Sequence, residues 1–257
     1  MRVALKFLVL AVAVSMAMGQ SEAPNDIAKK NEANQLYNDG NALYKKGNFQ
    51  GAIEKYTGAI AIIPEYQYYY QLGLCYKNLR QMDKAVAEFE NSIKLKPDFA
   101  VGHYALGGAY LAMADYDKSI ESFKSVLKAD PNMDRAIRGI TEAYAGKAQQ
   151  LLQAGKIEDA GKTVDEAMAK EYDNSKLYLL AARIYNKLSQ WEKALDMAQK
   201  ALEVKKRGSK GAEYFELGVA YKNLKEYAKA RKAFQESKKD PTYARNAQYE
   251  LDGLRGR

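Results

Sequence analysis

Small, bulky and aromatic residues recur in a fixed order along most of the chain, with polar residues between them. In the clearest copy the order is aromatic, leucine, glycine, aromatic, alanine, phenylalanine and proline, at Tyr69, Leu72, Gly73, Tyr76, Ala85, Phe89 and Pro97. Apolar residues three, four and seven apart share one face of a helix, so this order predicts two helices that pack on each other. Gly73 and Ala85 would let the two backbones approach, and Pro97 would end the second helix.

Similar copies precede and follow this one, which predicts an array of helix pairs. A single pair is too short to bury its apolar face, so neighbouring pairs must stack on it. Residues 242–257 would form a capping helix and a tail. The sequence has no run of alternating apolar and polar residues typical of strands, so the predicted fold class is all-α. We expect the array over residues 32–241, with pairs at 33–66, 66–99, 100–133, 134–174, 175–208 and 211–241.

The fourth pair is irregular because two frames of the pattern fit its first helix. Tyr144 is the last aromatic of one frame and the first aromatic of the other, so the frames differ by seven residues. Seven residues are close to two helical turns, and the same stripe can therefore face the core in both frames. We predict one long helix from about Asp134 to Ala154, which Gly155 would end.

These spacings resemble the signature of the tetratricopeptide repeat (TPR) family. The resemblance covers about Ala33 to Thr242. It implies an α-α superhelix, a right-handed solenoid of about six helix-turn-helix repeats. Members of this family mostly bind peptides or other proteins on the concave surface lined by the first helix of each repeat. The function implied is therefore that of a non-catalytic scaffold or adaptor for a peptide or partner protein.

Residues midway between the signature positions of the first helices cannot point into the core between the helices, so they are candidates for the binding groove. We assign Tyr69 and Tyr76 to packing and leave Tyr70 for a ligand. The alternative is that several of these tyrosines pack against adjacent repeats. In the first three repeats the candidates are Tyr37, Asn41, Tyr44, Tyr70, Gln71, Leu74, Lys77, Tyr104 and Leu111. Those in later repeats include Leu179, Arg183, Asn186, Phe215, Val219, Lys222 and Asn223.

The first nineteen residues are unlike the array. Two basic residues, an apolar run over 7–14 and the small residues of Ala17-Met18-Gly19 are typical of a secretory signal peptide. The alternative, an uncleaved membrane anchor, would need roughly twenty apolar residues, and the uncharged run is shorter. We expect residues 1–19 to be cleaved near Gly19 and residues 20–31 to form a flexible leader, with a helix beginning near Asp26. The protein would then be exported to the periplasm or secreted, with no integral membrane span.

The composition is ordinary for a soluble protein of 257 residues, with 47% hydrophobic and 28% charged residues, but the charge is uneven. The formal net charge is +8, and the segment from Val204 to Arg257 alone holds 14 Lys and Arg against 7 Asp and Glu. This block could attract an acidic protein, a lipid or a polymer, or it could be a solvated face. An exported location gives no support to nucleic acid as the partner of this block.

Little in the sequence points to catalysis. One cysteine and one histidine exclude a zinc cluster of the usual kind, and we find no phosphate loop or paired carboxylates, so we predict no enzyme and no cofactor. Cys75 and His103 fall at packing positions. The cation-and-asparagine clamp of co-chaperone TPR domains is essentially absent, because Tyr37, Gln71, Val101 and Ala105 stand at four of its positions. The alternative function is a structural subunit of an envelope or secretion assembly. The oligomeric state is left open.

Overall fold

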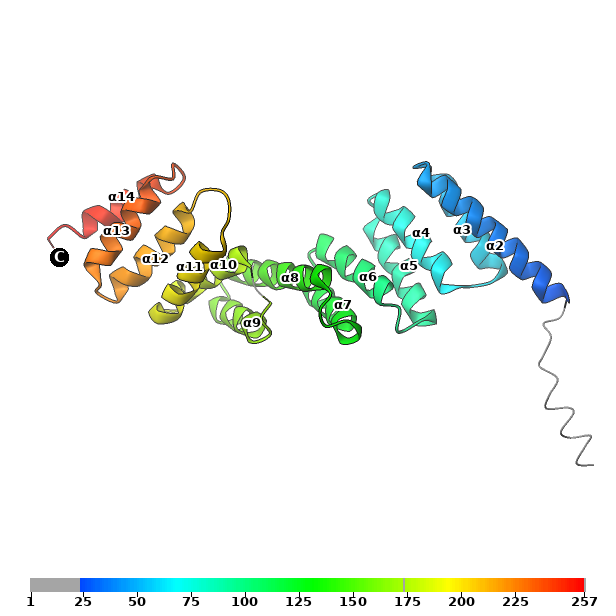
Figure 1. The fold of residues 1–257 in the computed structure, drawn as a ribbon, viewed down its shortest axis with the longest axis horizontal. Helices are drawn as coiled ribbons and strands as arrows, with labels where there is room; N and C mark the ends of the chain where they lie inside the picture. Colours follow the sequence, from blue (N-terminus) through cyan, green and yellow to red (C-terminus); the bar gives the residue numbers. More distant parts are fainter. Residues whose placement is uncertain (1–23, 173, 257) are drawn as a thin grey trace, which may run out of the picture. The chain divides into compact units, whose positions relative to one another are not determined.

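The computed structural model describes residues 24–172 and 174–256, and the expected signal peptide lies outside them. The described part of the chain forms thirteen α-helices and no strand, which confirms the predicted all-α class (Figure 1). The helices are α2 (Pro24–Lys45), α3 (Phe49–Ile62), α4 (Tyr66–Asn78), α5 (Met82–Leu95), α6 (Ala100–Ala112), α7 (Tyr116–Ala129), α8 (Asp134–Gln153), α9 (Ile157–Ala169), α10 (Ser175–Lys187), α11 (Trp191–Val204), α12 (Gly211–Asn223), α13 (Tyr227–Lys238) and α14 (Ala244–Gly253).

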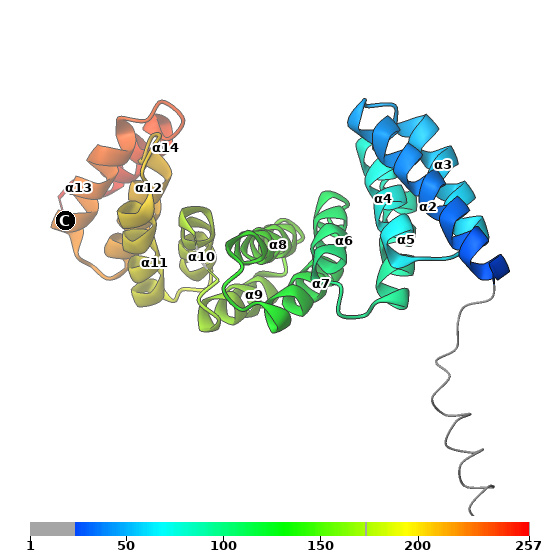
Figure 2. The ribbon, with the colours of Figure 1, turned by 45° about the vertical axis from the view of Figure 1, so that its right-hand side comes forward.

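The helices group into two compact units, and each is described by itself. Unit 1 ends at Pro97 and contains two helix pairs, α2 with α3 and α4 with α5, which lie side by side in Figure 2. Unit 2 begins at Asp98 and contains four further pairs and the terminal helix α14. Within each unit the first helix of a pair also packs on the second helix of the pair before it.

The two helices of a pair can approach closely because one of them carries the glycine of the repeat. A Cβ atom added to Gly73 would lie 2.6 Å from Phe89 Cε1 and 3.2 Å from the carbonyl oxygen of Ala85. Both distances are shorter than a normal van der Waals contact. The buried Ala85 and Phe89 thus occupy the space that a larger residue at position 73 would need, as the sequence predicts.

The irregular fourth pair contains one long first helix, α8, with the bounds that the two overlapping frames predict. Gly155 follows its end with φ of +75°, a conformation that glycine adopts at little cost. Lys147, which stands where leucine is usual, forms an ion pair of 2.6 Å with Asp117 of α7. The polar residue is tolerated because this side of α8 faces a carboxylate instead of an apolar core.

The two ends of the described chain are both helical. Helix α2 begins at Pro24, close to the helix start expected near Asp26, so residues 24–31 are helical and the flexible leader does not extend over them. Ala33 is fully buried in the same core cluster as Ala59 and Tyr68, so this part of α2 packs on the rest of unit 1. At the other end, α14 buries Ala247, as expected of a capping helix. No helix in the described ranges has the length and apolarity needed to cross a bilayer.

Candidate functional site

Two neighbouring first helices of unit 1, α2 and α4, carry most of the residues assigned to the groove. We call this surface the Tyr–Asn face and define it as Asn34, Tyr37, Asn41, Tyr44, Tyr70, Gln71, Leu74, Lys77 and Asn78. Hydrogen bonds join its two helices at both ends. The Tyr68 hydroxyl donates to Asn34 Oδ1 at 2.8 Å, and Asn78 Nδ2 donates to the Tyr44 hydroxyl at 3.1 Å. The face is therefore held in one arrangement by polar side chains that also remain partly open to solvent.

The tyrosines of this face are fixed by ring contacts. The ring of Tyr70 lies 5.9 Å from that of Phe89, and the ring of Tyr37 lies 5.8 Å from that of Tyr56. Tyr56 in turn donates its hydroxyl to Asn41 Oδ1 at 2.8 Å. These rings present rigid contact area, which limits the conformational entropy that a ligand must remove on binding.

The division of tyrosines made from the sequence is wrong in one respect. Tyr70 is half-buried against Phe89, and burial raises the pKa of its hydroxyl, so it packs as well as lining the face. The buried tyrosine of this helix is Tyr68, with 4% of its surface exposed, which we did not single out. Tyr68 lies four residues before Leu72, and this spacing places both on one side of the helix.

The same ring contact recurs in unit 2. Tyr104 lies 5.7 Å from Phe123, and Phe215 lies 5.7 Å from Phe234. In each case the first-helix ring stands three residues before the glycine of the repeat. Tyr104 is therefore half-buried, and Leu111, on the same helix, packs against the core of unit 2. Both candidates are less open than their sequence positions suggested.

Further along unit 2, residues expected to be open to a ligand bind neighbouring first helices instead. Arg183 Nε of α10 donates to Glu216 Oε1 of α12 at 3.0 Å, and Asn186 Nδ2 donates to Glu216 Oε2 at 3.0 Å. Lys222 of α12 pairs with Glu250 of α14 at 2.6 Å. Asn186 is buried, so this assignment to the groove is wrong. These polar groups join consecutive first helices.

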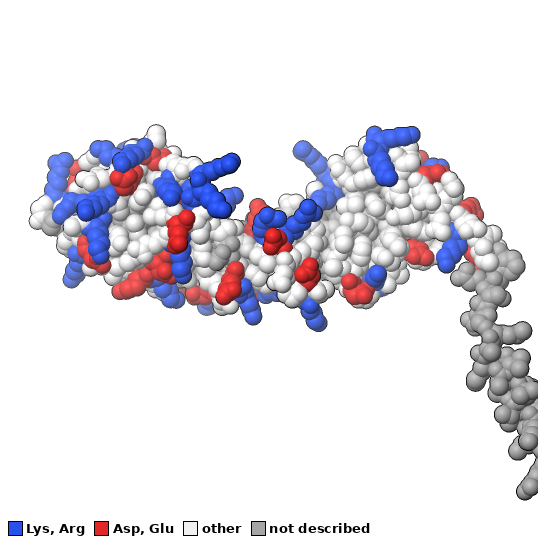
Figure 3. Space-filling view, in the orientation of Figure 1, with Lys and Arg blue, Asp and Glu red and all other residues white. Residues whose placement is uncertain are grey.

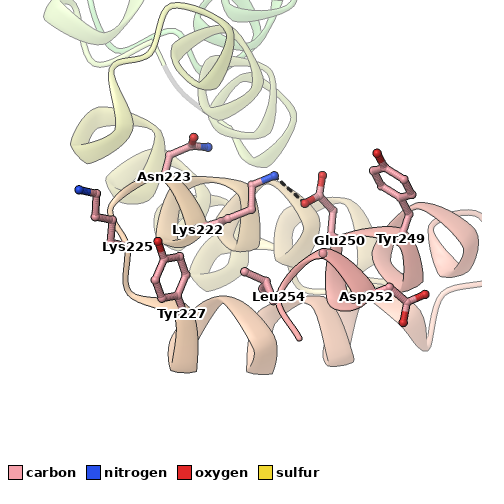
Figure 4. Close-up of a pocket in the computed structure, with 9 residues that line it drawn as sticks. Lys222, Asn223, Lys225, Tyr227, Tyr249, Glu250, Asp252 and Leu254 are labelled. Atoms are coloured by element: carbon pink, nitrogen blue, oxygen red, sulfur yellow. Dashed lines mark hydrogen bonds and ion pairs between the residues drawn. The ribbon is translucent and has the colours of Figure 1, made fainter. Parts of the chain in front are cut away.

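An open pocket of about 520 Å³ lies where α12 and α14 end (Figure 4). In the figure Lys222 points toward Glu250, while Asn223, Lys225 and Tyr227 lie on the other side of the labelled group. Tyr249, at the rim, has 78% of its surface exposed. The lining contains side chains of both charges, so its charge favours no single class of ligand.

Neither residue with possible chemistry forms a reactive site. Cys75 is completely buried, as its packing position predicts, and burial raises the pKa of its thiol to about 12. His103 is half-buried at its packing position. Across the residues that the structure describes, no group of His, Cys, Asp and Glu could hold a metal ion.

Several cations of the basic C-terminal segment are paired within unit 2. Lys205 binds the buried Glu213 at 2.7 Å, and Lys239 binds Glu236 at 2.7 Å. Lys229 pairs with Glu226 at 2.5 Å. Figure 3 shows red carboxylates among the blue side chains of these helices. The charge available to an outside partner is smaller than the count of lysines and arginines suggests.

Solved structures with a similar fold differ widely in sequence. A tetratricopeptide repeat protein from Parabacteroides merdae is 16% identical, with 86% of this chain and 84% of that chain covered and a TM-score of 0.43. A double mutant of MamA RS-1 is 20% identical, with 67% and 94% covered and a TM-score of 0.50. The first TPR of Spaghetti (RPAP3), bound to the HSP90 peptide SRMEEVD, is 20% identical, with 46% and 98% covered and a TM-score of 0.45.

A search of curated proteins finds no match to the chain. Models of the family described as tetratricopeptide repeat match residues 66–99, 100–133, 146–213 and 214–239. The first two matched segments follow the pairs α4 with α5 and α6 with α7, and the match over 146–213 begins within α8, in the second of its two frames. The chain belongs to the tetratricopeptide repeat family.

Proposed function

We propose that the protein is a non-catalytic scaffold or adaptor that binds a peptide or a partner protein on the first-helix faces of its repeats. The fold is typically an interaction scaffold, and TPR domains generally mediate contacts between proteins. The observation that supports a site on this chain is the Tyr–Asn face, where half-buried rings alternate with amides. Rings supply apolar contact, and amides can bond the backbone of an extended segment.

A pull-down with two matched variants tests this proposal. Leu74 lies on the Tyr–Asn face and is half-buried, whereas Leu95 ends α5 and is 48% exposed. Leu74→Arg should abolish partner recovery because it places a long cation in the middle of the face. Leu95→Arg should leave recovery unchanged. Equal recovery with both variants, at equal helix content by circular dichroism, would exclude the Tyr–Asn face as the binding surface.

The alternative function is a structural subunit of a cell-envelope or secretion assembly, engaged through the outer face and the basic C-terminal region. The internal pairs of Lys205, Lys229 and Lys239 leave fewer cations for such a role. Lys206 and Arg207 are exposed in the loop before α12. Reversing both charges should abolish assembly if the alternative is correct, and should leave the pull-down unchanged if the Tyr–Asn face binds the partner.

We place this function outside the cytoplasm, in the periplasm or after secretion, on the signal-like residues at the start of the sequence. N-terminal sequencing of the protein isolated from the cells that make it should then begin near Gln20. A protein that retains Met1 and stays in the cytoplasm would contradict this location while leaving the binding face untouched.

A further inference from the structure

The Tyr–Asn face ends at a group of exposed cations. We call this group the basic end and define it as Lys45, Lys46, Lys77 and Arg80, at the C-terminal ends of α2 and α4 and in the turns that follow. All four side chains are exposed. No carboxylate of the described residues lies within ion-pair distance of any of them.

The basic end adjoins the tyrosine rings directly. The hydrogen bond of 3.1 Å between Asn78 Nδ2 and the Tyr44 hydroxyl joins the residue after Lys77 to the residue before Lys45. Each lysine is therefore next in sequence to a residue of this bond. In Figure 3, blue side chains gather where α2 ends. Helix carbonyls at these ends stabilise nearby cations, but that does not remove the positive field over the neighbouring surface.

We propose, on the basis of the function proposed above, that the bound partner segment carries an aromatic or aliphatic residue next to one or more Asp or Glu residues. The apolar side chain packs on the rings of Tyr37 and Tyr70. The acidic side chains meet Lys45 and Lys77, and Asn41 lies between Tyr37 and Lys45 along α2. A neutral or basic segment would leave the cations uncompensated.

Several cations of unit 2 are paired internally, and the basic end differs from them. Lys205, Lys229 and Lys239 in unit 2 are satisfied by Glu213, Glu226 and Glu236. In unit 1, Lys84 lies 5.4 Å from the ring centre of Tyr76. The basic end thus joins unpaired charge to rigid apolar surface, and an acidic segment with one large apolar residue complements both.

The test uses a phage-displayed library of random peptides selected on the full chain, followed by fluorescence anisotropy of the selected peptides. We expect Asp or Glu to be enriched beside an aromatic or aliphatic residue. Lys45→Glu combined with Lys77→Glu should weaken binding by about tenfold or more, and Lys45→Gln with Lys77→Gln by less. Binding to the unchanged protein should also weaken between about 0.05 M and about 0.5 M sodium chloride. The matched control, Lys206→Glu with Arg207→Glu, should bind as the unchanged protein does.

The possible outcomes separate this inference from the proposed function. Selected peptides without acidic enrichment, or an affinity that both charge-reversal pairs leave unchanged, would overturn the acidic specificity. If such peptides still lost binding with Leu74→Arg, the Tyr–Asn face would remain the binding surface. Loss of binding with the control pair alone would move the acidic site to the C-terminal segment and overturn the inference. Circular dichroism of each variant shows whether the helices are intact.

Discussion

Lysine and tyrosine form a recurring contact on the outside of the repeats. In four repeats a lysine eight residues after the tyrosine lies over its ring, at 5.4 Å for Lys84 and Tyr76 and at 5.1 Å for Lys118 and Tyr110. The pairs in the fifth and sixth repeats lie at 5.1 Å and 5.4 Å. Exposed contacts of this kind contribute about 0.5–1 kcal/mol each. These contacts give some of the tyrosines a structural role, so the high tyrosine content does not require every tyrosine to bind a ligand.

Substitution of the repeat glycine tests the packing of single residues. A Cβ atom at position 73 would lie 2.6 Å from Phe89, whereas one at position 108 would meet nothing within 4 Å. Gly73→Ala should therefore lower the free energy of unfolding by about 2 kcal/mol through overpacking. Gly108→Ala should raise it by about 0.5–1 kcal/mol, because alanine favours helix. Urea unfolding measures both, and equal effects would show that the two sites are equally open.

The turns after the first helices are a second local feature. Ala114 has φ of +58° and Ser189 has φ of +58°, while Gly47 and Gly155 adopt +77° and +75° at the matching place. An alanine in this left-handed region costs about 1–2 kcal/mol. Part of that cost is offset by the lower flexibility of alanine in the unfolded chain.

Exchange of residues in these turns should change stability in opposite directions. Ala114→Gly should raise the free energy of unfolding by about 0.5–1 kcal/mol, because glycine relieves the left-handed strain. Gly155→Ala should lower it by about 1 kcal/mol, since a Cβ there meets nothing within 4 Å and only the backbone conformation opposes it. Thermal unfolding of the two variants checks the signs. A destabilising Ala114→Gly would mean that the turn carries no such strain.

At the scale of whole elements, α9 is held against its neighbouring helices partly by polar side chains. It buries mainly small residues, with Val164 as its largest buried apolar side chain. Its two adjacent carboxylates bind opposite neighbours. Asp165 accepts a hydrogen bond of 2.7 Å from Tyr185, and Glu166 accepts one of 2.5 Å from Tyr144. Polar contacts therefore supplement the thin apolar packing of this helix.

Removal of the Glu166 charge should loosen α9 in a manner that depends on pH. Hydrogen bonds from Tyr144 and Lys124 lower the pKa of Glu166 below its usual value of 4.5. The stabilisation is thus fully present above the unfolded pKa, and it is lost as the pH falls through the lower folded value. Glu166→Gln should be less stable than the unchanged protein at pH 7, and the difference should vanish in acid.

Hydrogen exchange of α9 amides and urea unfolding at several pH values check this prediction. Asp196→Asn is the matched control, because Asp196 forms an exposed pair with Lys200 within one helix. Its effect should be small, as exposed pairs contribute little. A stability difference for Glu166→Gln that persists unchanged below the folded pKa would show that the carboxylate charge is not its cause.

At the scale of the whole molecule, the sequence predicted the helix pairs better than it predicted the contacts between repeats. The helix pairs follow from residues three, four and seven apart, and the two frames around Tyr144 predicted the length of α8. The burial of Tyr68, the ring contact of Tyr70 with Phe89 and the bonds of Glu216 were not predicted. They join side chains that are distant in sequence, and their partners depend on how helices stack. For the same reason the sequence located the Tyr–Asn face but not which of its side chains are held by neighbours.

The most direct measurement of the central claim is site-specific photo-crosslinking in the cells that make the protein. A photoreactive phenylalanine analogue replaces Gln71 or Lys77 on the Tyr–Asn face, or the exposed Gln50 or Lys94 on the second helices α3 and α5 as controls. We predict adducts with a partner protein from Gln71 and Lys77, and none from Gln50 or Lys94. Adducts from the control positions alone, with none from the face, would contradict the account.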